Sequence, residues 1–332
     1  MFGHRAPIVG RQPAHGSGAA GRWHGITHNP WIPIAIASLA WGSSPAATKA
    51  VLVNGVSPFT IFPLKQTGGA LMVISALALV GRLPRIDADT LKAGAVIGIF
   101  NMTVPTILFT LGFEIIPASI GAVIAGVIPL TTILFSHWVV PGERFRLGRL
   151  PGLLLGMFGV AIIGWAPVGQ PSSRWILGVA LTTLGAACAG LGGAFTRRFA
   201  VRYQNRSLIV VQFITSAALL SLISIPFNGY AGYLTIDTAS LWLIIYMAAV
   251  PTVISFAAFM WASRIATAAR AALIGYAVPV LGAMGGVVLL SEPITLQLTV
   301  GVLAVAVGIV FSDRPDRQDD RRRAAARTTP PC

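Results

Sequence analysis

Long apolar segments separated by short polar ones occupy most of this sequence. Each apolar segment is close to the roughly 20 residues that an α-helix needs to cross a hydrocarbon core. The pattern therefore predicts an all-α polytopic membrane protein with ten transmembrane helices, at about residues 31–53, 58–80, 92–113, 118–139, 149–167, 175–196, 208–226, 240–262, 268–290 and 295–312.

The second part of the chain repeats the first. Pro129 recurs as Pro279 after 150 residues, and Glu143 recurs as Glu292 after 149 residues. A fixed period of this kind indicates two copies of one structural unit. We expect two five-helix repeats, between a disordered cytoplasmic leader and a disordered basic cytoplasmic tail, with the four parts at residues 1–30, 31–166, 175–312 and 313–332.

An odd number of helices in each repeat has a consequence for topology. The second repeat must enter the membrane from the face opposite to the first, so the two repeats are inverted. Inverted repeats are typical of alternating-access transporters, whose substrate site lies near the midplane between the halves.

The distribution of basic residues supports this topology. Of the 24 Lys and Arg residues, 21 fall in segments that ten helices place on one side, and only Arg174 falls on the other. Lys49 and Lys65 lie within helices. Because cytoplasmic loops are enriched in Lys and Arg, both termini are predicted to be cytoplasmic, in a cell inner membrane.

Composition agrees with a membrane protein and argues against other classes. The chain is 55% hydrophobic and 10% charged, whereas soluble domains contain roughly 25% charged residues. The net charge is +14, and most of the basic residues lie between the apolar segments. We therefore expect the lipid bilayer as a partner and no nucleic acid. Two cysteines and four clustered N-terminal histidines match no ligand spacing. No metal, cofactor or cleavable signal peptide is expected, and the chain is predicted to be a monomer or homodimer.

Polar residues within apolar segments are candidates for the substrate site, because burying them in a bilayer is costly. Trp41, Ser44 and Lys49 share one helix face. The full predicted set of substrate-binding residues is Trp41, Ser44, Lys49, Lys65, Asn101, Thr103, Gln212, Ser255 and Tyr276. The alternatives are that the hydroxyls bond to their own helix backbone and that the lysines extend to the headgroups.

A second set of residues is predicted to form gates near the helix ends. Prolines inside helices remove a backbone hydrogen bond and permit kinks, which can be hinges or static bends. Charged groups near the helix ends could close a mouth. The predicted gating residues are Glu114, Pro129, Arg197, Arg264 and Pro279.

These features resemble the drug/metabolite transporter superfamily, in particular its EamA-type family. The resemblance is carried by Trp41–Lys49 (WGSSPAATK), by Pro129 followed by Glu143-Arg144, and by Pro279 followed by Glu292-Pro293. It implies a secondary carrier for small solutes, with a central cavity lined by helices 1–4 and 6–9, and with helices 5 and 10 outside it.

The sequence thus predicts a secondary transporter that moves a small organic metabolite, such as an amino acid, by alternating access, with export favoured. The alternative within carriers is efflux of drugs or quaternary cations. An intramembrane enzyme is disfavoured, because the chain has no HExxH or GxSxG motif.

Overall fold

The computed structural model describes residues 29–142, 148, 150–165, 174–228, 231–265 and 268–312. Every regular element in these ranges is a helix. The predicted leader, most of which precedes residue 29, and the predicted tail lie outside the described residues.

Helices cover the described part of each of the ten predicted segments. In the first half they are α2 (Trp31–Gly42), α3 (Ser44–Val53), α4 (Pro58–Leu79), α5 (Ala88–Ile97), the π-helical segment η1 (Gly98–Thr103), α6 (Val104–Ile115), α7 (Ala118–Ala125), α8 (Ile128–Val139) and α9 (Leu150–Trp165). In the second half they are α10 (Trp175–Ala200), α11 (Asn205–Asn228), α12 (Ala231–Leu234), α13 (Thr238–Ala248), the π-helical segment η3 (Ala249–Ile254), α14 (Ser255–Ile265), α15 (Ala268–Leu290) and α16 (Leu296–Ser312).

Seven of the helices in the described ranges are long and apolar enough to cross a membrane, and two shorter apolar helices correspond to α9 and α16. The seven are Pro58–Leu79, Ala88–Ile115, Ala118–Val139, Trp175–Ala200, Asn205–Phe227, Thr238–Ala262 and Leu273–Leu290. Large apolar side chains also cover the outside of the molecule, since Leu79, Ile176 and Val288 are 88%, 77% and 72% exposed. An apolar surface of this extent requires lipid as its solvent. The molecule is therefore a multi-pass helical membrane protein.

The third predicted membrane segment of each half begins with the same kind of helix cap. Asp87 accepts a hydrogen bond from the Thr90 N–H at 2.7 Å, and Asp237 accepts one from the Ser240 N–H at 2.9 Å. Each carboxylate caps the exposed N–H groups of a helix start, α5 and α13 respectively. The pKa of each Asp lies below its ordinary value. The larger cause is a hydrogen bond from the side chain of the capped residue, Thr90 or Ser240, and the smaller is the hydrogen bond from its backbone N–H.

Both of these helices then pass through one turn of π-helix next to a proline. In η3, Pro251 has no N–H to donate to the Met247 carbonyl, and the Thr252 hydroxyl donates to that carbonyl at 2.7 Å. In η1, the Thr103 hydroxyl donates to the Gly98 carbonyl at 3.0 Å. A π-turn interrupts regular helix geometry and is frequent at functional sites. Both halves therefore carry a local irregularity at matching positions.

The two halves meet where the α7–α8 segment crosses α15. A Cβ placed on Gly126 would lie 2.9 Å from the Cβ of Pro279, and one placed on Gly275 would lie 3.2 Å from the Cγ of Pro129. Each predicted gating proline thus packs against a small residue of the other half, and the sequence numbers run in opposite directions along the contact. Such reciprocal contacts are the property of a two-fold interface. The helices consequently cross in antiparallel sense, as an inverted pair would.

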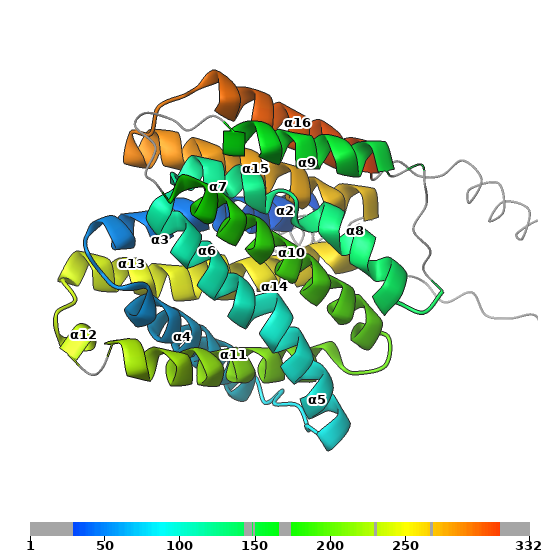
Figure 1. The fold of residues 1–332 in the computed structure, drawn as a ribbon. Coiled ribbons are helices and arrows are strands. Elements are labelled where there is room, and N and C mark those ends of the chain that lie inside the picture. Colours follow the sequence, from blue (N-terminus) through cyan, green and yellow to red (C-terminus); the bar gives the residue numbers. More distant parts are fainter. Residues whose placement is uncertain are drawn as a thin grey trace, which may run out of the picture.

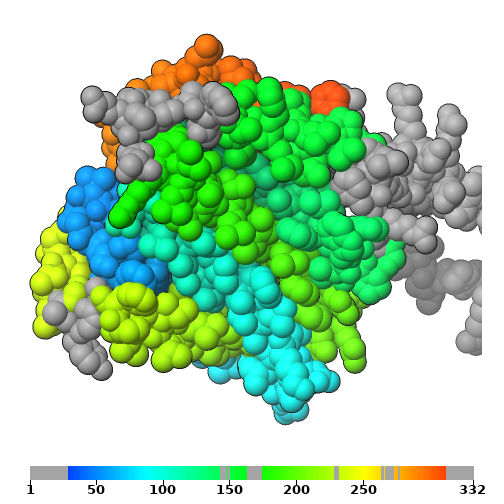
Figure 2. Space-filling model, viewed as in Figure 1, coloured from blue at the N-terminus to red at the C-terminus, as the bar shows by residue number. Residues whose placement is uncertain are grey.

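Helices α9 and α16, one from each half, lie side by side along one edge of the molecule (Figure 1). A Cβ on Gly308 would lie 2.7 Å from the Gly152 carbonyl oxygen and 3.0 Å from the Gly156 Cα. Gly152 and Gly156 of α9 therefore pack against Gly308 of α16 within the chain. In the space-filling view, α6 and α10 of the two halves contact each other across the middle of the face shown (Figure 2).

Candidate functional site

A chain of aromatic rings joins three helices near the break between α2 and α3. Trp41 lies edge-on to Phe256, with ring centroids 5.5 Å apart, and Phe256 lies 6.0 Å from Phe213. Trp41 also contacts Phe259 at 5.5 Å. Such edge-to-face arrangements are favourable for aromatic pairs. Trp41 of the first half is thereby packed against α14 of the second half and is linked through Phe256 to α11.

Gln212, beside Phe213, connects this aromatic chain to η1. A Cβ on Gly98 would lie 2.9 Å from the Gln212 carbonyl oxygen, so the α11 and η1 backbones are almost in contact. The Gln212 side chain is only 4% exposed, and its Oε1 has no hydrogen-bond partner in the described part of the chain. A buried acceptor without a donor costs about 1–3 kcal/mol.

Helix α4 approaches the same region and carries Lys65. Its neighbour Gln66 is buried and donates from Nε2 to the Met102 Sδ of η1 at 3.2 Å. One turn further on, a Cβ on Gly69 would lie 3.1 Å from the Thr252 side chain and 3.3 Å from the Phe213 ring. Lys65 is half-buried as a residue, and its ammonium has no hydrogen bond or ion pair with any described residue. Helix α4 thus brings to these elements a segment that carries a positive charge without a partner among the described residues.

The smaller polar side chains divide into two kinds. The Thr103 hydroxyl donates to the Gly98 carbonyl, and the Ser255 hydroxyl donates to the Pro251 carbonyl at 2.6 Å. Both side chains are buried and bonded to their own helix, which is the alternative that the sequence left open. Ser44 and Asn101 are half-buried, and no hydrogen bond of either side chain occurs within the described ranges.

Tyr246 is a further residue of this region that the sequence did not identify. Its hydroxyl donates to Ser43 Oγ at 2.7 Å, and Ser43 in turn donates to the Ala40 carbonyl at 2.9 Å. Ser43 stands between α2 and α3, just before Pro45. The hydrogen bond therefore ties α13 of the second half to the break in the first transmembrane segment. A tyrosine within an apolar segment was the only signal in the sequence.

Lys49 of α3 is not in this group, because its ammonium reaches the turn between α6 and α7. Its Nζ donates to the carbonyls of Phe113 at 2.7 Å, Ile116 at 3.2 Å and Glu114 at 3.4 Å. The ammonium thus caps the C-terminal end of α6, where helix geometry leaves carbonyls unpaired and a cation is favourable. The predicted gating residue Glu114 is exposed at this same turn.

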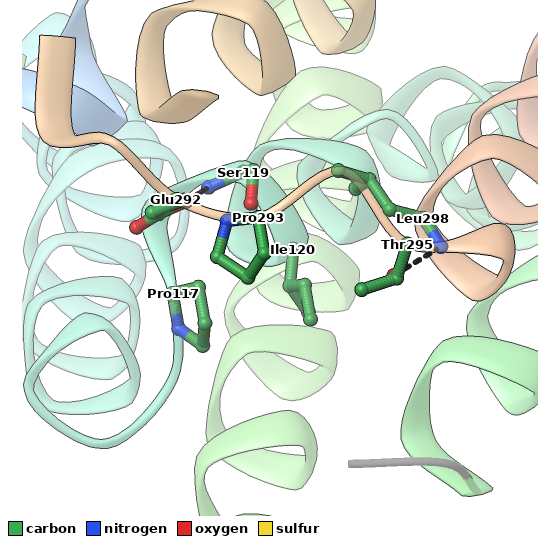
Figure 3. Close-up of a pocket in the computed structure, with 7 residues that line it drawn as sticks. All are labelled: Pro117, Ser119, Ile120, Glu292, Pro293, Thr295 and Leu298. Carbon is green, nitrogen blue, oxygen red and sulfur yellow. Dashed lines mark hydrogen bonds between the residues drawn. The ribbon is translucent and has the colours of Figure 1, made fainter. Parts of the chain in front are cut away.

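Glu292 lies on the other side of the same turn (Figure 3). Its Oε1 accepts from the Ala118 N–H at 2.6 Å, and its Oε2 accepts from the Ser119 N–H at 2.8 Å. These N–H groups open α7, so the carboxylate caps a helix that belongs to the other half of the chain. Lining a small pocket here are Pro117, Ser119, Ile120, Glu292, Pro293, Thr295 and Leu298. Glu292 marked the repeat in the sequence but was not among the predicted site residues.

The remaining predicted residues are distributed differently. Arg197 is exposed near the end of α10, away from the aromatic chain. The side chains of Arg264 and Tyr276 are outside the described part of the structure. The structure therefore brings together the elements that carry Trp41, Ser44, Lys65, Asn101, Thr103, Gln212 and Ser255. The Lys49 ammonium instead reaches the α6–α7 turn, where Glu114 also lies.

Comparisons with known proteins agree with the fold. The profile of the EamA-like transporter family matches residues 31–165 and 176–312, one match in each half. An "Uncharacterized transporter" of Archaeoglobus fulgidus is 25% identical over 283 residues, covering 84% of this chain and 96% of that protein. The "Uncharacterized transporter YvbV" of Bacillus subtilis is 27% identical over 282 residues, covering 83% and 88% respectively.

A solved crystal structure superposes with a TM-score of 0.61 over 86% of this chain and 96% of that chain, at 20% identity, and this likeness concerns the fold. The helical architecture and the named relatives define the class, a multi-pass transmembrane transporter. The chain belongs to the EamA-like transporter family, because both halves match its profile.

Proposed function

We propose that this protein is a secondary transporter that moves a small organic metabolite across the cell inner membrane by alternating access, in the direction of export. The observation that carries the proposal is the reciprocal packing of Pro129 on Gly275 and Pro279 on Gly126. Two halves related by such an axis can exchange conformations, so that a site between them faces one side and then the other. In this proposal ten helices span the bilayer, with both termini in the cytoplasm.

The solute site in this proposal lies among α2, α4, η1, α11 and α14. Three features there suit a solute that is partly apolar and carries both a hydrogen-bond donor and an anionic group. The rings of Trp41 and Phe256 offer an apolar surface, Gln212 Oε1 is an unused acceptor, and Lys65 is a positive charge without a described partner. An amino acid or a related carboxylated metabolite satisfies all three.

Efflux of a quaternary cation is the second candidate, and the aromatic chain is the observation that favours it. Aromatic faces attract such cations, with energies of about 0.5–2 kcal/mol. The charge on Lys65 opposes a cation in the same site, so we favour the metabolite.

Counterflow in liposomes tests the proposal. Purified protein is reconstituted in vesicles preloaded with unlabelled amino acids, other carboxylated metabolites or quaternary ammonium compounds, and uptake of the labelled solute is followed. A carrier shows transient accumulation above equilibrium, whereas a pore shows none. Absence of counterflow for every class would refute the proposed function, and counterflow of quaternary ammonium compounds alone would assign the second candidate.

A further inference from the structure

One carboxylate joins the two halves at the α6–α7 turn. Both oxygens of Glu292, in the segment that follows α15, are bonded to backbone N–H groups of α7, at 2.6 and 2.8 Å. These are charge-assisted hydrogen bonds, which are shorter and roughly twice as strong as neutral ones. The partners are 174 and 173 residues apart in the sequence, so the bonds link one repeat to the other.

The end of α15 is shaped to direct Glu292 toward α7. Ser291 has φ 54°, the only positive φ of a non-glycine residue in the described ranges. This left-handed conformation is unfavourable for a residue with a Cβ, and it turns the chain back over the helix end. The Glu292 N–H then donates to the Gly286 carbonyl at 3.3 Å. A Cβ on Gly286 would collide with Glu292 Oε2 and would lie 2.6 Å from the Ser119 nitrogen.

Lys49 holds the opposite side of the same turn, and its hydrogen bonds there lie within one half. Its ammonium binds three carbonyls at the end of α6, and both α3 and α6 belong to the first repeat. Residues 116 and 117 are all that separates α6 from α7. Separation of α15 from α7 would therefore break the two bonds of Glu292 and leave those of Lys49 intact.

We propose that Glu292 is a latch for the mouth at this end of the molecule, which the proposed orientation places outside. Its carboxylate caps α7 while the mouth is closed and leaves the Ala118 and Ser119 N–H groups each time the mouth opens. The role is positional, because Glu292 acts on the relation between the halves and not on the solute. The inference rests on the proposed alternating-access function.

The test is an electron–electron distance measurement between spin labels at Val53→Cys and Leu296→Cys, in a background without the native cysteines. These positions are 70% and 76% exposed at the ends of α3 and α16, so labels there disturb no packing. Glu292→Gln keeps the shape of the side chain but presents an amide where one N–H needs an acceptor. We expect the ratio of long-distance to short-distance populations to rise about tenfold, equivalent to about 1.4 kcal/mol.

Asp237→Asn is the matched control, because Asp237 also caps a helix but does so locally, through Ser240. It should leave the distance distribution unchanged. Gly286→Ala is the second variant, since it forces α15 away from α7 without changing any charge, and it should shift the distribution in the same direction as Glu292→Gln. Monodisperse elution in detergent selects the folded variants.

Two outcomes would overturn the latch. The first is that a folded Glu292→Gln or Gly286→Ala variant shows the same distance distribution as the parent protein. The second is that Asp237→Asn shifts the distance distribution as much as these variants do. The measurement needs no solute, so its result is separable from the counterflow experiment. If counterflow occurs and the variants show parental distances, only the latch is refuted. If no counterflow occurs, the proposed function on which the latch rests is refuted.

Discussion

The crossing of α15 with the first half can be tested with two glycines three residues apart on one helix. A Cβ on Gly282 would lie 2.6 Å from the Ala122 Cβ and 3.3 Å from the Gly42 carbonyl oxygen. A Cβ on Gly285 would meet the Ala46 Cβ at 3.4 Å and the Gly42 carbonyl oxygen at 3.9 Å, which are ordinary contacts. Gly282→Ala therefore perturbs the interface between the halves, and Gly285→Ala is its control.

The expected magnitude follows from these distances. Carbon atoms in favourable contact are about 3.5–4.0 Å apart, so α15 must move by about 1 Å to accommodate the methyl group that Gly282→Ala adds. Insertion of a methyl group into a packed interface typically costs about 1–3 kcal/mol. Both variants gain the same helix propensity, about 1 kcal/mol. The difference between the two variants therefore isolates the interface, and Gly282→Ala should be less stable than Gly285→Ala by about 1–3 kcal/mol.

Thermal unfolding in detergent, followed by intrinsic fluorescence at one scan rate, measures this difference. A loss of this size should lower the apparent Tm of Gly282→Ala by several degrees relative to Gly285→Ala, since 1 kcal/mol corresponds to about 2–4 °C in domains of 150–250 residues. Counterflow should fall in Gly282→Ala as well. Equal Tm values for the two variants would refute the close crossing of α15 with α7 and α2.

Three further predictions concern single side chains. Lys65→Met should weaken solute affinity at least about tenfold in counterflow while leaving the Tm unchanged or higher, because it removes a charge without a described partner; unaltered affinity would exclude Lys65 from the site. Tyr246→Phe removes the donor to Ser43 and should lower stability by about 0.5–1.5 kcal/mol in thermal unfolding; an unchanged Tm would contradict the link. The folded-state pKa of Asp237 is lowered by its bonds to Ser240, so the cap stabilises the protein above the unfolded pKa of about 3.9 and is lost as the pH falls through the folded value. The difference in Tm between the parent and Asp237→Asn should accordingly shrink toward zero in acid, and a difference that is constant with pH would contradict this linkage.

The helices themselves were predictable because membrane insertion demands continuous apolar segments. The starts at Trp31, Pro58, Ala118, Trp175 and Ala268 agree with the predicted residues. The errors occur at polar ends. Helix α5 begins four residues before the predicted start because the Asp87 carboxylate caps it, and α10 continues past the predicted end into a basic segment.

The arrangement of the polar residues was less predictable, because it depends on long-range contacts. Sequence spacing placed Lys49 on the same helix face as Trp41. Its ammonium nevertheless caps the end of α6 and is not part of the group around the aromatic chain. Glu292 reads as a loop carboxylate, and only the fold brings it to the start of α7. The irregular turns η1 and η3 were also missed, since prolines are common in membrane helices and their neighbours determine the effect.

The pairing of α9 with α16 has a consequence for biosynthesis. The Gly152 carbonyl oxygen and the Gly156 Cα lie against Gly308, near the end of the last described helix. While the ribosome is still making the second half, α9 has contacts with α7 and α8 but no α16 to pack against. The first half therefore cannot complete its own assembly before the final helix is inserted, and the two halves reach their mature packing together.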